Sequence, residues 1–374
     1  PLVDSFCTTR EKAIEIPSYD VNLKQCKTCE TIQISSPPDT SNIYINYIYE
    51  SSSSPDLSKH FEEYAEEIET EWENKKLNIL EIGANDGLLI SYLLKKGYNS
   101  ITAIDPSPQT KHLKLKDVRV INDFFQQKSF EEIENNSYNL IIANNCFSHI
   151  PHLTKCLSLC KKLLSTTGTL VVEVQSCLDL IEKVVFDYIY HEHYYYHTVN
   201  SFERITKLIG LEIYSVSHLP TKGGTYRFKI GLKGVHNRDH SVDYWKYREE
   251  ISNVHTIKPW KLMEEYLEIT KRKLNNYINN HSGDIVAYGA SATGTVLLKY
   301  MNINKPLRCI IDDNPKRQGL FAPGSGIPIM SLESLRENDL CIVLAWRHKH
   351  YIIPKLEKLG IEYILPLPVF QKNK

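Results

Sequence analysis

Short apolar segments alternate with helical patterns through the middle of the chain. The candidate strands cover residues 77–83, 100–105, 118–122, 138–144 and 168–174. Between them, apolar residues recur at helical spacing, as in "PHLTKCLSLCKKLL" (151–164). This alternation is typical of a parallel, doubly wound sheet with helices on both faces.

Two further strand patterns follow directly after one another, at 211–219 and 224–234, with only "PTKGG" between them. So short a connection forces the two strands to pair antiparallel. Parallel strands closed by an antiparallel hairpin follow the order of class I methyltransferases, whereas ordinary dehydrogenase folds do not end this way. We therefore predict an α/β fold with a Rossmann-like class I methyltransferase sheet.

A long helical stretch over 241–280 separates this pattern from a second α/β unit. That unit begins at "DIVAYGASATG" (284–294) and continues through "PLRCIIDDNP" (306–315) and "DLCIVLAW" (339–346). With 374 residues the chain is too long for one ordinary core. The expected division is a small N-terminal module (1–55), a methyltransferase domain (56–215) and a C-terminal α/β domain (216–374).

Charge and composition narrow the classes of partner. The formal net charge is −1, from 44 basic and 45 acidic side chains, so nucleic acid is not expected as the main partner. The sequence has no apolar run of about 18 residues, which argues against a membrane span, and its polar start lacks a signal-peptide core. The nine cysteines are scattered, as in a protein with reduced thiols, so a cytoplasmic location is expected.

Cys26 and Cys29 stand apart from the other cysteines because they form a CxxC knuckle, "CKTC". Such a knuckle supplies half of a tetrahedral zinc site, and a complete site needs two more ligands. Only Cys7 lies nearby in the sequence. Zinc is therefore possible here, in a site that we expect to be incomplete.

Polar groups follow three successive strands of the first sheet. "EIGANDG" (81–87) places glycines where backbone can approach a ligand, at the strand end where open α/β sheets bind ligands. Asp105 follows the next strand and can hold two ribose hydroxyls. Asp123 can accept from an adenine amino group, with Phe124 packed on the base. A strand-end acid can also be a simple helix cap, but all three together favour S-adenosylmethionine.

The stretch "YIYHEHYYYH" (188–197) has three interpretations. In a strand, His191 and His193 would project to one side, which is a metal-ligand spacing. A pure core role is disfavoured because each polar group would need a partner. An acid/base role fits best, since a neutral imidazole near pH 7 is a suitable base.

The whole pattern resembles the sugar C-methyltransferase family, which acts on nucleotide-linked keto-deoxysugars. The motifs that carry the resemblance are "EIGANDG", "AIDPS", "NNCFSHI", "IYHEHYYY", "KGGTYR", "YGASATG" and "IDDNPKRQG…PGSGIPI". The family has an N-terminal zinc module, a methyltransferase domain and a C-terminal α/β domain, with the nucleotide-sugar between the last two. The resemblance implies methyl transfer to a ring carbon through a base-generated enolate.

The resemblance also implies roles for individual residues. His193 is the expected base, with Tyr190 and Glu192 beside it, and His149 is the second active-site histidine. The expected cofactor contacts are Glu81, Gly83, Asn85, Gly87, Asp105, Pro106, Asp123, Phe124 and Asn144. The expected substrate contacts are Tyr47 and Tyr49 from an N-terminal flap, Gly224, Arg227, Ser291 and Lys316.

Two other functions remain open at this point. A sugar O-methyltransferase also needs a base but no adjacent ketone. A non-catalytic homologue would bind the nucleotide-sugar or the cofactor without reacting. The nucleotide-linked deoxysugar is the expected partner, and the chain is expected to be a monomer or a weak homodimer.

Overall fold

The computed structural model describes residues 1–373 except 40, 46, 48, 73, 74, 112, 114, 132 and 134. The chain forms two compact units. The seven-stranded unit contains residues 23–179 and 192–255, and the six-stranded unit contains residues 1–22, 180–191 and 256–374. Within the described residues, no helix has the length and apolar character needed to cross a bilayer.

The large sheet of the seven-stranded unit has the strand order of a class I methyltransferase. Its strands are β3 (Asn78–Ile82), β4 (Ser100–Ile104), β5 (Val118–Ile121), β6 (Tyr138–Asn144), β7 (Leu164–Gln175), β9 (Leu211–Leu219) and β10 (Thr225–Leu232). They lie in the order β5-β4-β3-β6-β7-β10-β9. The first five are parallel, and β10 pairs antiparallel with both β7 and β9. The predicted α/β fold is confirmed.

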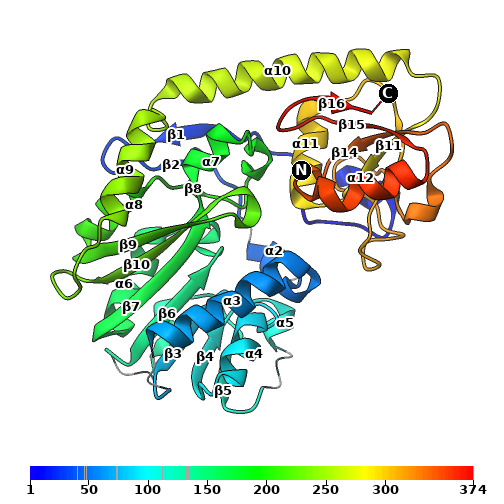
Figure 1. Ribbon diagram of the computed structural model, residues 1–374. Coiled ribbons are helices and arrows are strands. Elements are labelled where there is room, and N and C mark those ends of the chain that lie inside the picture. The colour runs from blue at the N-terminus through cyan, green and yellow to red at the C-terminus, as the bar shows by residue number, and fades with distance from the viewer. Residues whose placement is uncertain are drawn as a thin grey trace. The chain divides into compact units, whose positions relative to one another are not determined.

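Helices cover both faces of this sheet (Figure 1). On one face lie α3 (Pro55–Glu71) and α4 (Leu88–Lys95), and on the other lie α6 (Leu153–Leu163), α8 (Val199–Leu208) and α9 (Ser241–Ile251). Side chains alternate across the sheet as strand geometry requires. Ile79 packs with the α3 and α4 core, and its neighbour Leu80 packs with the α6 and α8 core.

A small second sheet lies in the same unit. It consists of β1 (Leu23–Gln25), β2 (Ile32–Ile34) and β8 (Tyr195–Tyr196), all antiparallel. It therefore joins the hairpin that carries Cys26 and Cys29 to the strand that follows the "YHEH" motif. The short elements α2 (Ser41–Ile45), α5 (Pro108–Lys111), η1 (Ser51–Ser53), η2 (Gln127–Phe130), η3 (Phe147–His149) and η5 (Thr221–Gly223) complete the unit.

The six-stranded unit has its own mostly parallel sheet. Its strands are β11 (Ile285–Tyr288), β12 (Leu307–Ile311), β13 (Ile329–Met330), β14 (Leu340–Val343), β15 (Glu362–Leu365) and β16 (Gln371–Lys372), in the order β13-β12-β11-β14-β15-β16. Only β16 runs antiparallel to its neighbour. Its helical elements are α1 (Arg10–Glu15), α10 (Ile257–Asn280), α11 (Ala292–Met301), α12 (Lys349–Lys358), η4 (Phe186–Tyr188), η6 (Leu332–Ser334) and η7 (Trp346–His348), and α7 (Cys177–Glu182) spans the change of unit.

The predicted domain boundaries differ from these units. The boundary at residues 215 and 216 falls inside β9, whose partner β10 pairs with β7, so the hairpin belongs to the first sheet. The predicted N-terminal module is also divided. Residues 1–22 belong to the six-stranded unit, where Cys7 forms a β-bridge with Phe321, and residue 23 onward belongs to the seven-stranded unit.

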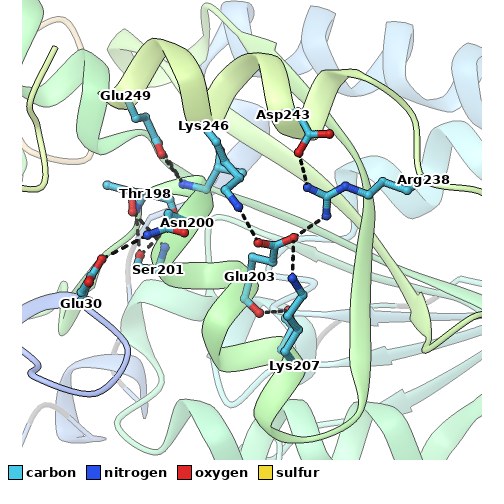
Figure 2. A network of polar contacts seen from close by, with 12 residues as sticks. Glu30, Thr198, Asn200, Ser201, Glu203, Lys207, Arg238, Asp243, Lys246 and Glu249 are labelled. Carbon is cyan, nitrogen blue, oxygen red and sulfur yellow. Dashed lines mark hydrogen bonds and ion pairs between the residues drawn. The ribbon is translucent and has the colours of Figure 1, made fainter. Parts of the chain in front are cut away.

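A buried polar network holds the segment that follows the "YHEH" motif (Figure 2). The Thr198 and Ser201 side chains cap the start of α8 reciprocally, and the Glu249 carboxylate accepts from the Val199 N–H at 2.9 Å. One turn further on, Glu203 accepts from Lys207, Arg238 and Lys246. Burial alone would raise the pKa of Glu203, but these three cations lower it to about 2. The carboxylate therefore ties α8 to α9 and to the loop before α9.

Candidate active site

A cavity of about 960 Å³ opens at the carboxyl ends of β3, β4 and β6, entirely within the seven-stranded unit. The predicted cofactor residues that line it are Glu81, Gly83, Asn85, Asp105, Pro106, Phe124 and Asn144. Gly87 is not among the lining residues, but it begins α4 with a φ of 72°. The sequence motifs at successive strand ends therefore gather around one space.

The turn after β3 requires glycine at position 83. Gly83 has a φ of 76°, and a Cβ there would lie 2.7 Å from the Cβ of Cys146. Both the backbone angle and the lack of space exclude a side chain. The Gly83 N–H donates to the Ile104 carbonyl oxygen at 2.8 Å, which holds the turn against the end of β4.

Asp105 lies on the cavity wall with its carboxylate oriented by backbone. Its two oxygens accept from the Ser107 N–H at 2.7 Å and from the Asn85 N–H at 3.2 Å. Burial raises the pKa of Asp105, and these hydrogen bonds oppose that rise. Each carboxylate oxygen has a second lone pair, so the group can still accept from ligand hydroxyls.

Two buried polar side chains point to a ligand in this cavity. Within the described part of the chain, neither amide atom of Asn144 nor Oε2 of Glu81 has a hydrogen-bond partner. Buried polar groups are nearly always paired, and an unpaired one costs about 1–3 kcal/mol. Burial, with Asp86 and Asp105 nearby, raises the pKa of Glu81 well above its usual range. Both side chains line the cavity, so a polar ligand there would satisfy them.

Asp123 and Phe124 are neighbours in the turn after β5, but only one of them lines the cavity. Phe124 lines the cavity, as the adenine-stacking prediction requires. Asp123 is not among the lining residues, because its carboxylate accepts from the Phe124 N–H at 2.8 Å and from the Ser129 hydroxyl at 2.9 Å. Its predicted bond to an adenine amino group would have to compete with these local contacts.

The segment before α3 closes over the strand ends. Tyr47 and Tyr49, predicted as flap residues, both line the cavity, while residues 46 and 48 of the same predicted flap lie outside the described residues. The Tyr49 carbonyl oxygen accepts from the Asn85 side-chain amide at 3.0 Å, and the Tyr47 carbonyl oxygen accepts from that of Gln109 at 2.8 Å. The backbone of this segment is therefore docked on the loop after β3 and on α5.

His149 and His193 meet beside the cavity. Their ring centroids are 4.7 Å apart at an interplanar angle of 71°, and His149 lines the cavity. The Tyr44 hydroxyl lies 2.8 Å from Nδ1 of His149. Burial lowers the pKa of His149 well below 6.5, and the charges of His193 and Lys222 lower it further. His149 is therefore a neutral imidazole at pH 7, able to accept a proton.

The "YHEH" motif is a turn and not a strand, so the geometry assumed for a metal-binding HxH pair is wrong. His191 and Tyr190 belong to the six-stranded unit, where their rings lie 6.2 Å apart. Glu192 and His193 belong to the seven-stranded unit, and Glu192 is buried. Across the residues that the structure describes, no three His, Cys, Asp or Glu side chains are grouped as metal ligands.

The knuckle of Cys26 and Cys29 forms the turn between β1 and β2. Backbone N–H groups of Cys29 and Thr28 lower the pKa of the Cys26 thiol. Cys29 donates its thiol hydrogen to the Thr31 hydroxyl at 3.3 Å. The described residues bring no third metal ligand to this turn, so the arrangement does not support a complete zinc site.

Two of the predicted substrate residues, Gly224 and Arg227, lie in the seven-stranded unit. Gly224 has a φ of 141°, and a Cβ there would lie 2.1 Å from the Asp179 side chain. Arg227 is 3% exposed, binds Glu173 at 2.6 Å and stacks over the Tyr64 ring. Arg227 thus pairs with a carboxylate of β7 and stacks on a ring of α3, which leaves it poorly suited to hold a diphosphate.

Ser291 and Lys316 belong to the six-stranded unit. The Ser291 hydroxyl caps α11 by accepting from the Gly294 N–H at 3.0 Å. Lys316 is exposed in the loop after β12, where its N–H donates to the Asn314 side chain at 3.0 Å. Their contact with a substrate stays a prediction.

Sequence reasoning missed Tyr44 and Lys222, both of which line the cavity. Tyr44 belongs to the same tyrosine-rich segment as the predicted flap residues, so composition alone did not distinguish it. Lys222 lies in "PTKGG" and begins the motif "KGGTYR", but neither pattern gave the lysine itself a role. A lysine in a turn is usually solvated, and only the fold shows that this turn faces the cavity.

Two family descriptions match successive parts of the chain. The family description "Methyltransferase domain" matches residues 57–216, and "C-methyltransferase C-terminal domain" matches residues 220–368. The chain is 24% identical over 303 residues to the C-methyltransferase NovU of Streptomyces niveus, covering 78% of this chain and 72% of that protein.

Solved structures with a similar fold cover about half of the chain. A protein of Pyrococcus horikoshii OT3 aligns with a TM-score of 0.40 and 12% identity over 52% of this chain and all of its own. Magnesium protoporphyrin IX methyltransferase of Synechocystis PCC 6803, solved with S-adenosylmethionine bound, aligns with a TM-score of 0.35 and 13% identity, covering 46% of this chain and 78% of its own.

Proposed function

Because the chain is a C-methyltransferase that uses S-adenosylmethionine, we propose that it methylates a ring carbon of a nucleotide-linked keto-deoxysugar. The observation that carries the proposal is the contact between the His193 ring and His149, which lines the cavity. Carbon methylation next to a carbonyl requires a base, and a neutral imidazole is suited to that role near pH 7. The sugar as substrate class rests on the sequence motifs and on the likeness to NovU.

The cavity residues fit the cofactor. Asp105 would hold the ribose hydroxyls, Phe124 would pack on the adenine, and Gly83 leaves room for backbone to approach. Asn144 and Glu81 offer the buried polar atoms that lack partners within the described residues. When bound, S-adenosylmethionine supplies an electrophilic methyl group on a sulfonium.

In the proposed reaction, an imidazole of the histidine pair takes the proton from the sugar carbon next to the carbonyl. We assign this role to His193, as predicted, with Glu192 buried beside it in the chain. The electron pair of the broken C–H bond then delocalises onto the carbonyl oxygen as an enolate. The enolate carbon would form the new bond to the methyl carbon as the bond from that methyl group to sulfur breaks, with its electron pair left on sulfur as a neutral thioether. The abstracted proton stays on the imidazole until it is released to water.

His149 has a positioning role in this scheme. Its Nδ1 is 2.8 Å from the Tyr44 hydroxyl, which fixes the orientation of the ring. Its lowered pKa keeps it uncharged, so it does not oppose the protonation of His193 by charge repulsion. His193 can therefore take up the proton while His149 stays neutral.

The six-stranded unit is proposed to hold the nucleotide part of the substrate. Its loop after β11, "GASATG", leads into the start of α11, where Ser291 caps the helix. Gly289 in this loop has a φ of 107°, and a Cβ there would meet Ala345 at 2.4 Å. Ser291 and Lys316 stay the candidate contacts.

The test is methyl transfer to a panel of dTDP-, UDP- and GDP-linked 4-keto sugars. A C-methyl group survives acid hydrolysis and appears on a ring carbon, which separates carbon from oxygen methylation. An O-methyl product would refute the carbon assignment. Absence of cofactor binding by calorimetry would favour a non-catalytic homologue.

A further inference from the structure

We propose that Lys222 binds the keto oxygen of the substrate and stabilises the negative charge that develops there during proton abstraction. The inference rests on the proposed function and adds a group to it. Lys222 lies in η5, between β9 and β10, and lines the same cavity as His149. No sequence motif assigned it a role.

The turn holds Lys222 in an unfavourable backbone conformation. Its φ of 53° and ψ of 27° are left-handed, a region that residues with a Cβ rarely adopt. Such a conformation persists only where the surroundings enforce it, and it is common at functional sites.

Hydrogen bonds on both sides of Lys222 enforce this conformation. The Thr221 carbonyl oxygen accepts from the Gly224 N–H at 2.9 Å and from the Thr225 hydroxyl at 3.0 Å, and the Ser176 N–H donates to the Gly224 carbonyl oxygen at 3.1 Å. Gly224 itself has no room for a side chain beside Asp179. These hydrogen bonds and the close contact at Gly224 therefore fix the conformation of the turn that carries Lys222.

The Lys222 ammonium has no dedicated acidic partner. Among the described residues it makes no hydrogen bond or ion pair. The carboxylate that acts on it by charge is Glu173, which is already bound by Arg227 and His60. Burying a cation without a partner is costly, so a ligand oxygen in the cavity would complete its environment.

The charge state of Lys222 suits an oxyanion better than a base. Burial lowers its pKa to about 8, despite the opposing charge of Glu173. At pH 7 the amine is therefore mainly protonated and cannot accept the sugar proton. The base function stays with His193, and the Lys222 charge helps to keep the neighbouring His149 imidazole neutral.

The expected effect can be measured without methyl transfer. In deuterated water and without S-adenosylmethionine, the wild type should exchange the acidic ring proton of a nucleotide-linked keto sugar. Lys222→Met should slow this exchange by about 10²–10³-fold, the size seen on removing one oxyanion donor. Lys222→Arg should recover part of the rate because it keeps the charge. Lys233→Met, an exposed lysine at the far end of the same hairpin, should exchange like the wild type.

Two pH profiles separate a charge role from a structural one. The wild-type exchange rate should fall as the pH rises through about 8, where Lys222 loses its proton. Lys222→Arg should move this fall to higher pH. Lys222→Met should abolish the fall in rate near pH 8. It should also move the acid limb of the profile to higher pH, because the pKa of His149 rises once a nearby cation is gone. Unchanged calorimetric affinity for S-adenosylmethionine would show that Lys222→Met is folded.

Three outcomes overturn the inference. If the wild type exchanges and methylates while Lys222→Met does so at the same rate, Lys222 has no role and the proposed function stands. If borohydride traps the sugar on Lys222, detected by mass spectrometry, the amine acts as a covalent nucleophile. If the wild type neither exchanges nor methylates any keto sugar of the panel, the proposed function fails and this inference fails with it.

Discussion

The rings of His149 and His193 lie edge to face with their centroids 4.7 Å apart, although 44 positions separate them in the sequence. His149 comes from η3, just after β6, and His193 from the turn before β8. The small sheet that contains β8 and the capped start of α8 fix the second position. Two parts of the fold thus bring two imidazole rings into contact beside the cavity.

Asp105→Ala should weaken binding of S-adenosylmethionine. Removing a charge-assisted contact to the ribose should cost about 1.5–3 kcal/mol, which corresponds to a dissociation constant about 10- to 100-fold higher. Calorimetric titration measures the change directly. Glu62→Ala, an exposed acid on α3, serves as the control and should bind like the wild type. Equal affinity in the Asp105 variant would remove Asp105 from the cofactor site.

Glu203→Gln should destabilise the seven-stranded unit by about 2–3 kcal/mol, because a neutral amide loses charge-assisted bonds to three cations. The native pKa of Glu203 is about 2, below its ordinary value of 4.5. Its contribution to stability is therefore present above pH 4.5 and lost as the pH falls toward 2. Urea unfolding at pH 7 and pH 3.5 measures both effects.

The matched control for this variant is Glu250→Gln, an exposed acid on α9. It should change the free energy of unfolding by less than about 0.5 kcal/mol. If Glu203→Gln is equally mild at pH 7, the network in Figure 2 does not stabilise the fold.

His197→Phe should make the protein less sensitive to acid. His197 is fully buried against Phe202, and neither ring nitrogen has a hydrogen-bond partner among the described residues. Burial lowers its pKa from 6.5 to about 3. Between these values the unfolded state binds a proton that the native state does not, so stability falls as the pH falls.

The measurement for His197 is the free energy of unfolding at pH 8 and at pH 5. The wild type should lose about 2 kcal/mol more than His197→Phe between these two pH values, since one proton is worth about 1.4 kcal/mol per pH unit. His255→Phe, which alters an exposed histidine, should behave like the wild type. An identical pH dependence in all three proteins would show that His197 is not the source.

The sequence was sufficient for the main sheet and for much of the cavity lining. Strand ends in a parallel sheet meet at one edge, so Glu81 and Asp105 could be placed together from periodicity, whereas Asn144 was named only through the family resemblance. The division into units could not be predicted, because residues 1–22 and 180–191 join the six-stranded unit through contacts that are distant in sequence. The metal interpretation of the "YHEH" motif assumed a strand, whereas the motif is a turn.

Zinc content tests the knuckle at Cys26 and Cys29. The purified chain should hold less than one zinc per molecule, because two thiolates fill only half of a tetrahedron. Elemental analysis after removal of loosely bound metal gives the number. A full equivalent of zinc, lost in Cys26→Ser, would mean that further ligands complete the site.

Proton exchange at the sugar carbon tests the central claim most directly. The wild type should exchange the acidic ring proton of a nucleotide-linked keto sugar with deuterated water in the absence of S-adenosylmethionine. His193→Ala should reduce this exchange by about 10²–10⁴-fold while cofactor and substrate binding stay largely intact, and His149→Ala should exchange at an intermediate rate. Loss of exchange in His149→Ala alone would move the base to His149. Exchange at the wild-type rate in both variants would contradict the claim that this histidine pair abstracts the proton.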